Sequence, residues 1–150
     1  MRIDVITLFP DMVEQVVNYG VVGRAADRKL MYLQCWNPRD YTVDKHRTVD
    51  DRPYGGGPGM LMKVQPLEET IQAVREKNPL AQLIYLSPQG KPVNQAMLAK
   101  QVGTQSVIFL CGRYEGVDER LIQKEVDQEW SIGDYVISGG ELAAMVCIDA

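Results

Sequence analysis

The stretch Ser131–Gly140 reads S-I-G-D-Y-V-I-S-G-G and bears on the fold and the site together. Three of its ten residues are glycine, at positions 133, 139 and 140, and a short apolar and aromatic run lies between them. Glycine at this density permits unusual backbone conformations and lets another group approach the main chain closely. The stretch therefore predicts either two turns that flank a buried strand, or a pocket wall whose N–H and C=O groups face a ligand.

Two further stretches favour the pocket wall. Tyr85–Gly90 (Y-L-S-P-Q-G) and Cys111–Gly116 (C-G-R-Y-E-G) each follow an apolar run and end in turn residues. Three corners between a strand and a turn, in one small domain, indicate loops gathered at one edge of a parallel sheet. Open α/β sheets bind their ligands at that edge. The sequence thus predicts one ligand pocket built from three corners.

Length and composition limit the possible classes of protein. The chain has 150 residues, 45% hydrophobic and 24% charged, which is typical of one soluble domain. No apolar run approaches the roughly 20 residues that span a bilayer, and the first ten residues do not resemble a signal peptide. Three widely spaced cysteines and a single histidine favour free thiols and offer no metal-site spacing. We expect a cytoplasmic protein with no membrane partner and no bound structural metal.

The charge is unevenly distributed. Net charge is −4, which does not favour nucleic-acid binding overall. Residues 1–110 carry 13 basic and 11 acidic side chains, whereas residues 111–150 carry 3 and 9. The acidic end is interpreted as solvated helix surface. A local basic patch is enough for nucleic-acid binding, so the total does not exclude that class of partner.

Periodicity predicts strands and helices that alternate along the chain. Strands are expected at 2–8, 30–35, 83–86, 107–110 and 129–132. Helices are expected after an N-cap at Asp11, at 21–28, with Pro66 in a first turn, from Pro92, at 117–126 and at 141–150. In the helix from Pro92, the side chains expected to face the core are Ala96, Leu98, Ala99 and Val102. The alternation is typical of an α/β fold with a parallel sheet flanked by helices.

Residues 36–58 break this pattern, because they are polar, charged and irregular. Between positions 39 and 54, four cationic side chains are interleaved with four aspartates. A connection this long in a compact domain is either a flexible surface loop or a functional segment. As a substrate-binding arm it would use arginine and lysine for phosphates, His46 for a base or phosphate, and aspartate for base N–H groups. The glycines at 55–57 lack the spacing of a phosphate-binding P-loop and fit a hinge better.

The three corners offer a limited chemistry. No G-x-G-x-x-G follows the first strand, and no Ser-His-Asp or Cys-His set is available. What remains is a pocket of backbone groups with Tyr114, Tyr135 and the carboxylate of Glu115. Backbone groups can read an adenine edge, while a carboxylate or an aromatic face can lie near a cation. S-adenosylmethionine carries both an adenine and a sulfonium, so it fits better than a nucleoside triphosphate.

Five motifs then follow one another in a recognisable order. They are L-F-P at 8–10, D-x-x-R-T-V-D-D-x-P-Y-G-G-G-P-G-M at 44–60, Y-L-S-P-Q-G at 85–90, C-G-R-Y-E-G-V-D-E-R at 111–120, and W-S-I-G-D-Y-V-I-S-G-G-E-L at 130–142. Together they resemble the bacterial tRNA (guanine-N1)-methyltransferases of the SPOUT superfamily, across essentially the whole chain. Those enzymes methylate N1 of the guanine just 3′ of the tRNA anticodon.

The resemblance implies a parallel α/β domain with a deep trefoil knot, a homodimer, S-adenosylmethionine bound within the knot, and tRNA lying across both subunits. It implies backbone contacts to adenine from Ile132, Gly133, Tyr135 and Ile137. Arg113 and Glu115 are the catalytic candidates: Arg113 supports the reacting site, and Glu115 approaches the methionine end and a Mg²⁺ ion. The implied cofactor pocket comprises Tyr85, Leu86, Ser87, Pro88, Gln89, Gly112, Tyr114, Glu115, Ile132, Gly133, Asp134, Tyr135, Val136, Ile137, Ser138, Gly139 and Gly140. The implied tRNA contacts are His46, Arg47, Asp50, Arg52 and Gly59.

The sequence departs from the family in two respects. Ala143 stands where the family usually has proline, which loosens the expected turn into the last helix. Family members also run on for roughly another hundred residues, a typical size for a further small domain. The resemblance places the general base, an aspartate, in that continuation. We therefore expect residues 1–150 to be an N-terminal domain that binds cofactor but lacks the base.

Two other functions stay open at this point. One is a knotted domain that binds S-adenosylmethionine or RNA without chemistry. The other is a methyltransferase of the same superfamily that acts on a different RNA, which the motif at 44–60 disfavours.

Overall fold

The computed structural model describes every residue from Met1 to Ala150 and is built around one five-stranded parallel sheet. The strand order is β2-β1-β6-β5-β7. The strands are β1 (Arg2–Ile6), β2 (Tyr32–Trp36), β5 (Leu83–Pro92), β6 (Ser106–Cys111) and β7 (Gln128–Ser131). This confirms the α/β fold with a parallel sheet.

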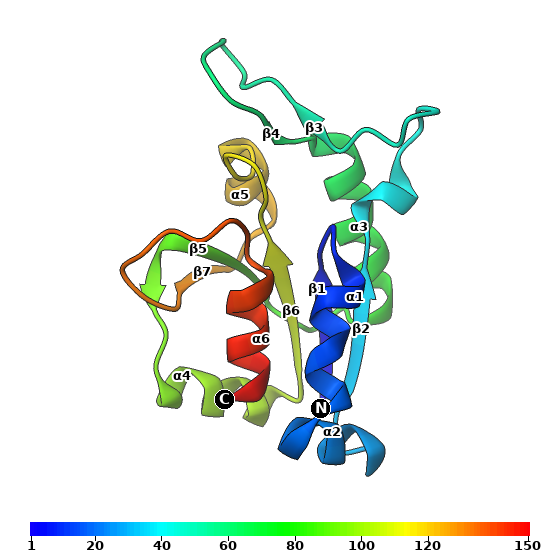
Figure 1. Cartoon of the computed structure of the whole chain (residues 1–150), viewed down its shortest axis with the longest axis vertical. Helices are drawn as coiled ribbons and strands as arrows, with labels where there is room; N and C mark the ends of the chain where they lie inside the picture. The colour runs from blue at the N-terminus through cyan, green and yellow to red at the C-terminus, as the bar shows by residue number, and fades with distance from the viewer.

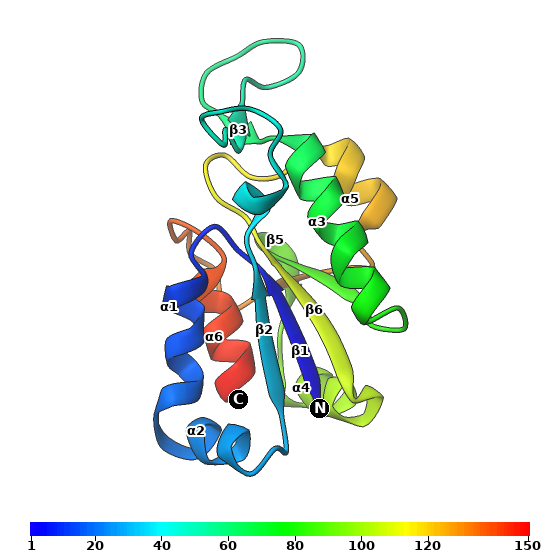
Figure 2. The ribbon, with the colours of Figure 1, turned by 90° about the vertical axis from the view of Figure 1, so that its right-hand side faces the viewer.

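Helices cover both faces of the sheet. Figure 2 shows α1 (Pro10–Glu14) and α6 (Glu141–Asp149) on one face, and α3 (Val64–Lys77) and α5 (Glu119–Glu125) on the other. The remaining helices are α2 (Gly20–Asp27), α4 (Gln95–Thr104) and the short 3₁₀ helices η1 (Gln15–Asn18) and η2 (Pro38–Tyr41). The two termini lie at the same end of the molecule (Figure 1). No helix has both the length and the apolar character needed to cross a bilayer.

The central strands are buried on both sides. Along β6, Val107 and Phe109 belong to the core cluster packed against α6, whereas Ile108 and Leu110 belong to the cluster packed against α3 and α5. Successive side chains of a strand point to opposite faces. A strand covered on both faces therefore favours apolar residues on both sides, which explains the continuous apolar runs at 83–86 and 107–110.

Two predicted helix starts are wrong. Asp11 is not an N-cap: α1 begins one residue earlier at Pro10, and Phe9 at the cap position makes no side-chain cap bond. Proline suits a first turn because its φ is already helical and its missing N–H is not needed there. Pro92 ends β5 and does not begin a helix. The next helix, α4, starts after Asn94, whose side-chain oxygen accepts the N–H of Met97 at 3.0 Å.

The predicted core face of α4 is also wrong. Ala96, Ala99 and Val102 are exposed, Leu98 is half-buried, and the buried residue of the helix is Gln101. The reason is position: α4 lies across the lower end of the sheet in Figure 1, away from its two faces. Its apolar side chains border a cavity of about 300 Å³ beside the end of α6.

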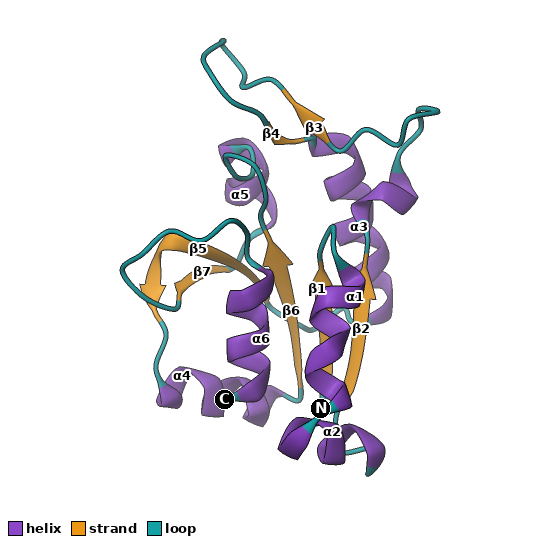
Figure 3. Cartoon of the chain, viewed as in Figure 1, coloured by secondary structure: helices purple, strands orange, loops and turns teal.

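The predicted irregular stretch forms an arm, defined here as residues 37–60, that projects from the end of the molecule opposite the termini (Figures 1 and 3). It contains η2 and β3 (Asp50–Asp51), which pairs antiparallel with β4 (Leu61–Met62). Val49 is buried in the core cluster under α3, so the middle of the arm packs against the core. The chain between Asp51 and Gly59 is mostly exposed.

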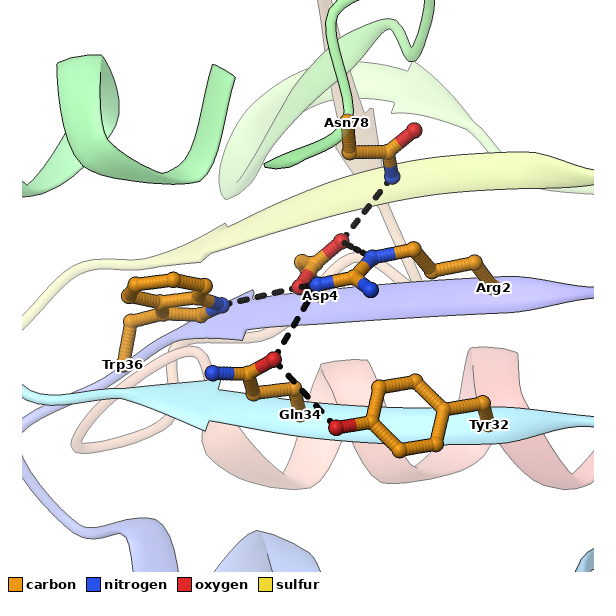
Figure 4. A network of polar contacts seen from close by, with 6 residues as sticks. All are labelled: Arg2, Asp4, Tyr32, Gln34, Trp36 and Asn78. Atoms are coloured by element: carbon orange, nitrogen blue, oxygen red, sulfur yellow. Dashed lines mark hydrogen bonds and ion pairs between the residues drawn. The ribbon is translucent and has the colours of Figure 1, made fainter. Parts of the chain in front are cut away.

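A buried carboxylate joins β1, β2 and α3 (Figure 4). Asp4 is fully buried, and its two oxygens accept hydrogen bonds from Arg2 Nε at 2.9 Å, Trp36 Nε1 at 2.8 Å and Asn78 Nδ2 at 2.9 Å. Trp36 is the last residue of β2, directly before the arm, and Asn78 caps the C-terminus of α3. Asp4 thus fixes the point from which the arm leaves the sheet.

We expect Asp4→Ala to destabilise the fold strongly. Removing one partner of a buried ion pair typically costs about 3–5 kcal/mol, and Trp36 and Asn78 would lose their acceptor as well. Arg2 is 30% exposed and can turn to water, so the effect should fall near the lower end of that range. Urea unfolding measures it. The control is Asp40→Ala, which breaks the exposed Asp40–Arg47 pair and should change stability by less than about 1 kcal/mol. Equal effects of the two substitutions would contradict this account.

Candidate functional site

A pocket of about 520 Å³ lies beside the middle of β5 and at the carboxyl ends of β6 and β7, which both neighbour β5 in the sheet. The three predicted stretches line it together. Every residue predicted for the cofactor contributes to its wall except Asp134, which is exposed. The predicted residues that line the pocket are Tyr85, Leu86, Ser87, Pro88, Gln89, Gly112, Arg113, Tyr114, Glu115, Ile132, Gly133, Tyr135, Val136, Ile137, Ser138, Gly139 and Gly140. The three predicted corners therefore do lie together around one pocket at the edge of the sheet.

The first wall, Tyr85–Gly90, is extended and not a tight turn. β5 continues through Pro92, and its pairing with β7 shifts register between Leu86 and Lys91. Gly90 is needed there, because a Cβ at this position would lie 2.5 Å from backbone atoms of Trp130. The turn residues Pro88 and Gly90 thus mark a break in strand pairing, and the sequence pattern does not distinguish this from a turn.

The second wall, the loop 132–139 between β7 and α6, is neither a strand nor a helix (Figure 3). Tyr135 and Val136 are exposed, so the alternative of a buried strand is wrong. No backbone–backbone hydrogen bond engages any residue of this loop. A few of its groups have side-chain partners, such as Gly133 N–H with Ser131 Oγ at 3.2 Å. The others need water or a ligand, because backbone polar groups are almost always paired.

Gly140 closes the loop against β6. Its N–H donates to the carbonyl of Gly112 at 3.0 Å. A Cβ on Gly140 would lie 2.8 Å from the Cα of Cys111, whose residue is fully buried and cannot withdraw. The loop 132–139 and the third wall of the pocket, Cys111–Gly116, therefore meet through their main chains at Gly140, with no room for a side chain between them.

The pocket is acidic. Glu115 and Glu119, which are exposed, and the half-buried Glu129 line it, so part of the acidic excess of residues 111–150 surrounds the pocket. Burial, and then the nearby charge of Glu119, raise the pKa of Glu129. Burial also raises the pKa of Tyr85, which therefore stays a neutral phenol. Carboxylates in a partly enclosed site favour a cationic ligand.

The predicted tRNA contacts lie along the arm, and only the last of them reaches the pocket. His46, Arg47 and Arg52 are exposed, and Asp50 is half-buried in β3. Arg47 pairs with Asp40 at 2.6 Å, so one of the expected phosphate contacts is partly neutralised within the arm. Gly59 has φ +84° and packs against Glu115, where a Cβ would lie 2.6 Å from Cγ.

The end of the arm is joined to the pocket through the main chain. The N–H of Glu115 donates to the carbonyl of Met60 at 2.8 Å, and the N–H of Met62 donates to the carbonyl of Gly116 at 2.9 Å. The arm and the pocket residues Glu115 and Gly116 thus form one continuous surface. Neither the sequence of the arm nor that of Cys111–Gly116 predicts this contact by itself.

We predict that residues 42–57 are less ordered than the sheet, and we test this on the mostly exposed outer arm, residues 52–59. Between Arg52 and Gly59, the one backbone hydrogen bond runs from Gly56 N–H to the carbonyl of Pro53. We expect the amides of these residues to exchange with D₂O within seconds at neutral pH, while those of β6 stay protected, because few contacts oppose local opening. Hydrogen exchange read by mass spectrometry makes the comparison. Protection of 52–59 equal to that of β6 would contradict the prediction.

The sequence reasoning missed one polar residue beside the pocket. Glu141, the first residue of α6, is fully buried, and its Oε2 accepts from Arg113 Nε at 2.9 Å. A carboxylate directly after Gly-Gly looks like an ordinary acidic first turn of a helix, so the pattern gave no signal for burial. Ala143, at the position that departs from the family, lines the pocket as well.

The comparisons with known proteins agree on one family. The family model described as tRNA (Guanine-1)-methyltransferase TrmD matches residues 1–150. A tRNA (guanine-N(1)-)-methyltransferase of Halorhodospira halophila is 65% identical over 99% of this chain and 57% of its own length. Those of Shewanella sediminis and Pasteurella multocida are 60% and 58% identical, over the whole chain and 62% of their length.

A solved structure agrees as well. The crystal structure of tRNA (m1G37) methyltransferase from Aquifex aeolicus superposes with a TM-score of 0.90 at 36% identity, covering 99% of this chain and 67% of that one. The chain thus spans about 60% of the length of the curated relatives named above. With a family match along its whole length and the same fold, the chain belongs to the tRNA (guanine-1)-methyltransferase family.

Proposed function

We propose that this chain is the cofactor-binding domain of an enzyme that methylates N1 of the guanine 3′ of the tRNA anticodon, with S-adenosylmethionine as methyl donor. The observation that carries the proposal is the loop 132–139, whose backbone groups lack backbone partners and line a pocket of about 520 Å³. That volume lies within the range of small-molecule and cofactor sites. The names of the relatives supply the substrate class.

The residues present fit such a cofactor. In this proposal the adenine edge would meet backbone groups of Ile132, Gly133, Tyr135 and Ile137, which line the pocket and are the contacts that the family likeness implies. Glu115, Glu119 and Glu129 complement the positive sulfonium and ammonium groups. When bound, S-adenosylmethionine supplies the methyl group. The chain binds and orients it, and Arg113 presents a fixed positive charge to the reacting end of the pocket.

A Mg²⁺ ion near Glu115 has weaker support. No group of three or more His, Cys, Asp or Glu side chains in this chain could hold a metal ion. Mg²⁺ is often bound by only one or two carboxylates with water and substrate oxygens, so Glu115 alone could contribute one ligand. We assign no step to the metal.

The exposed arm is proposed as the tRNA-binding segment. Lys45, Arg47 and Arg52 are exposed, as is His46, and the end of the arm at Gly59 abuts Glu115 at the pocket. Phosphate contacts along the arm would position the anticodon stem, while the base to be methylated enters beside Glu115. The trefoil knot, the cytoplasmic location and a further C-terminal domain belong to the same proposal and rest on the family likeness.

The homodimer has a candidate surface. Exposed apolar side chains occur on α6, at Leu142 and Val146, and at the start of α2, at Tyr19 and Val21. Figure 2 shows α6 beside α1 on one face of the sheet. Leu142 and Val146 lie four residues apart, on one side of α6, and are each 48% exposed. Two-fold dimers are the commonest soluble homo-oligomers, and such a patch is typical of their interfaces.

We expect the chain to be a dimer at micromolar concentration, and Val146→Glu to make it a monomer, because the charge would be buried in the interface. Light scattering coupled to size exclusion measures the mass. The control is Leu80→Glu, which replaces an exposed leucine outside this patch and should leave the dimer intact. A monomeric wild-type chain, or dimers of all three proteins, would contradict the proposed surface.

The test of the function uses the full-length protein that contains this chain. Unmodified tRNA is incubated with it and methyl-labelled S-adenosylmethionine, and the modified nucleoside is mapped by mass spectrometry. The proposal predicts N1-methylguanosine directly 3′ of the anticodon. Methylation at another position or of another RNA would assign the chain to a different enzyme, and cofactor binding without transfer would make it a non-catalytic binding domain.

A further inference from the structure

Glu141 is a charged residue in an unusual place. Its side chain is completely buried at the first position of α6, directly behind the pocket wall. Each of its oxygens has one partner: Oε1 accepts from Thr7 Oγ1 at 2.7 Å, and Oε2 accepts from Arg113 Nε at 2.9 Å. A buried carboxylate is tolerated only when it is paired and hydrogen-bonded in this way.

Thr7 and Arg113, the two partners of Glu141, both make a further contact with Phe9. Thr7 is itself fully buried and accepts the N–H of Phe9 at 2.9 Å. The guanidinium carbon of Arg113 lies 4.5 Å from the centroid of the Phe9 ring, which is a cation–π distance. The segment that follows β1 therefore holds the same guanidinium twice, through the carboxylate and through the ring.

Arg113 is the one member of this cluster that reaches the pocket. Its side chain is 20% exposed and lines the wall with Ser138 and Gly139. Nη1 lies 3.4 Å from Ser138 Oγ, and Nη2 has no hydrogen-bond partner in the chain. Nε is directed away from the pocket toward Glu141, so the guanidinium plane is set by a residue that lies outside the pocket wall.

We propose that Glu141 and Thr7 are positioning residues, which hold the guanidinium of Arg113 in one orientation with its Nη2 edge free for substrate. This inference rests on the proposed function for the identity of that substrate. A planar donor fork recognises an oxygen acceptor well only when its orientation is fixed beforehand. Thr7 fixes the carboxylate of Glu141, and Glu141 fixes the arginine. The segment that follows β1 thereby orients a side chain at the pocket, Arg113, that lies more than a hundred positions later in the sequence.

A packing role and the proposed positioning role for Thr7 predict opposite rankings of two conservative variants, Thr7→Val and Thr7→Ser. Thr7→Val keeps the shape and the buried methyl group but removes the hydroxyl. Thr7→Ser keeps the hydroxyl but removes the methyl group. Packing alone predicts that valine is the better substitute in this buried site. Positioning through the hydrogen bond predicts that serine is the better one.

The test reads Arg113 directly in the 150-residue chain. The Nε–Hε resonance of Arg113, assigned by its loss in Arg113→Lys, should exchange slowly with water in the wild type and in Thr7→Ser. It should exchange at least about tenfold faster in Thr7→Val and in Glu141→Gln. In these variants the equilibrium constant for opening of the hydrogen bond at Arg113 Nε is expected to rise roughly tenfold. Thermal unfolding of each variant verifies that it is folded. A wild-type-like signal in Thr7→Val, or any ranking that places valine at or above serine, overturns the proposal.

A second readout separates this inference from the proposed function. In the full-length protein, Thr7→Val should lower kcat for tRNA methylation about tenfold and leave the affinity for S-adenosylmethionine within about twofold, as expected for an interaction used in the transition state. Thr7→Ser should restore kcat. Full-length wild type that does not methylate tRNA would refute the proposed function, while the Arg113 resonance would still decide the positioning role. Loss of cofactor affinity in place of kcat would contradict the positioning role.

Discussion

Gly140→Val is expected to abolish S-adenosylmethionine binding by the folded chain. A Cβ at this position would lie 2.8 Å from the Cα of Cys111 and 3.2 Å from the N of Gly112, and both belong to the main chain where β6 passes into the pocket. Neither can move aside as a flexible side chain would. The branched side chain would therefore push the loop 132–139 away from Cys111 and Gly112 and displace the backbone groups assigned to the adenine.

The size of the effect follows from the cost of overpacking. Forcing extra carbon atoms into a filled site typically costs about 1–3 kcal/mol, and displaced hydrogen bonds add to that, so binding should weaken by at least about 100-fold. Titration calorimetry measures the affinity. The matched control is Gly103→Val in α4, where a Cβ would meet no atom within 4 Å. The account is wrong if Gly140→Val binds as the wild type does, or if both variants lose binding equally.

The chain by itself should methylate tRNA far more slowly than the full-length protein. N1 of guanine carries a proton at neutral pH, and a positioned base has to remove it as the methyl group is transferred. Such a base typically contributes about 10²–10⁴-fold. In our proposal the pocket carboxylates Glu115, Glu119 and Glu129 serve the cofactor's positive charge. His46 is exposed on the arm and does not line the pocket. The base is therefore assigned to residues outside this chain.

The comparison is made at equal subunit concentration, with unmodified tRNA and saturating S-adenosylmethionine. We expect the rate of the chain to be at least about 100-fold below that of the full-length protein, since substrate positioning is lost along with proton transfer. Cofactor binding by the same preparation serves as the control for folding. A rate within about tenfold of the intact protein, well inside the general-base range, would place the base among residues 1–150 and contradict the assignment.

The parts of the fold that the sequence predicted share a simple physical cause. Residues 83–86 of β5 and 107–110 of β6 are buried on both faces, so these positions are all apolar and the runs are unambiguous. The helix that became α3 has a regular stripe at Leu67, Ile71 and Val74, all of which are buried. Periodicity is reliable where one element faces one uniform core.

The errors have equally specific causes. α4 lies across the end of the sheet, where only Met97 and Leu98 of its apolar side chains pack against the core, and the stripe at Ala96, Ala99 and Val102 misled the assignment. Pro88 and Gly90 sit in an extended segment with a register shift, where the pairing partner β7 decides the conformation. Both outcomes depend on tertiary neighbours, which local patterns do not encode.

The site was predictable in outline because its walls are main chain. Glycine-rich corners reveal where a backbone approaches a ligand, and the three stretches meet as expected. What holds those walls was not predictable. Thr7 and Glu141 are 134 positions apart, and neither belongs to a glycine-rich corner, so their hydrogen bond has no counterpart in any single motif. The same is true of the contact between Gly59 in the arm and Glu115 at the pocket.

The central claim is that the pocket formed by these three corners binds S-adenosylmethionine, and calorimetric titration of the 150-residue chain with that cofactor tests it most directly. The account predicts saturable binding with one cofactor per chain, because all the walls lie within residues 85–143. Folding of the titrated sample is verified by cooperative thermal unfolding. No heat of binding at millimolar cofactor, from a chain shown to be folded, would contradict the claim.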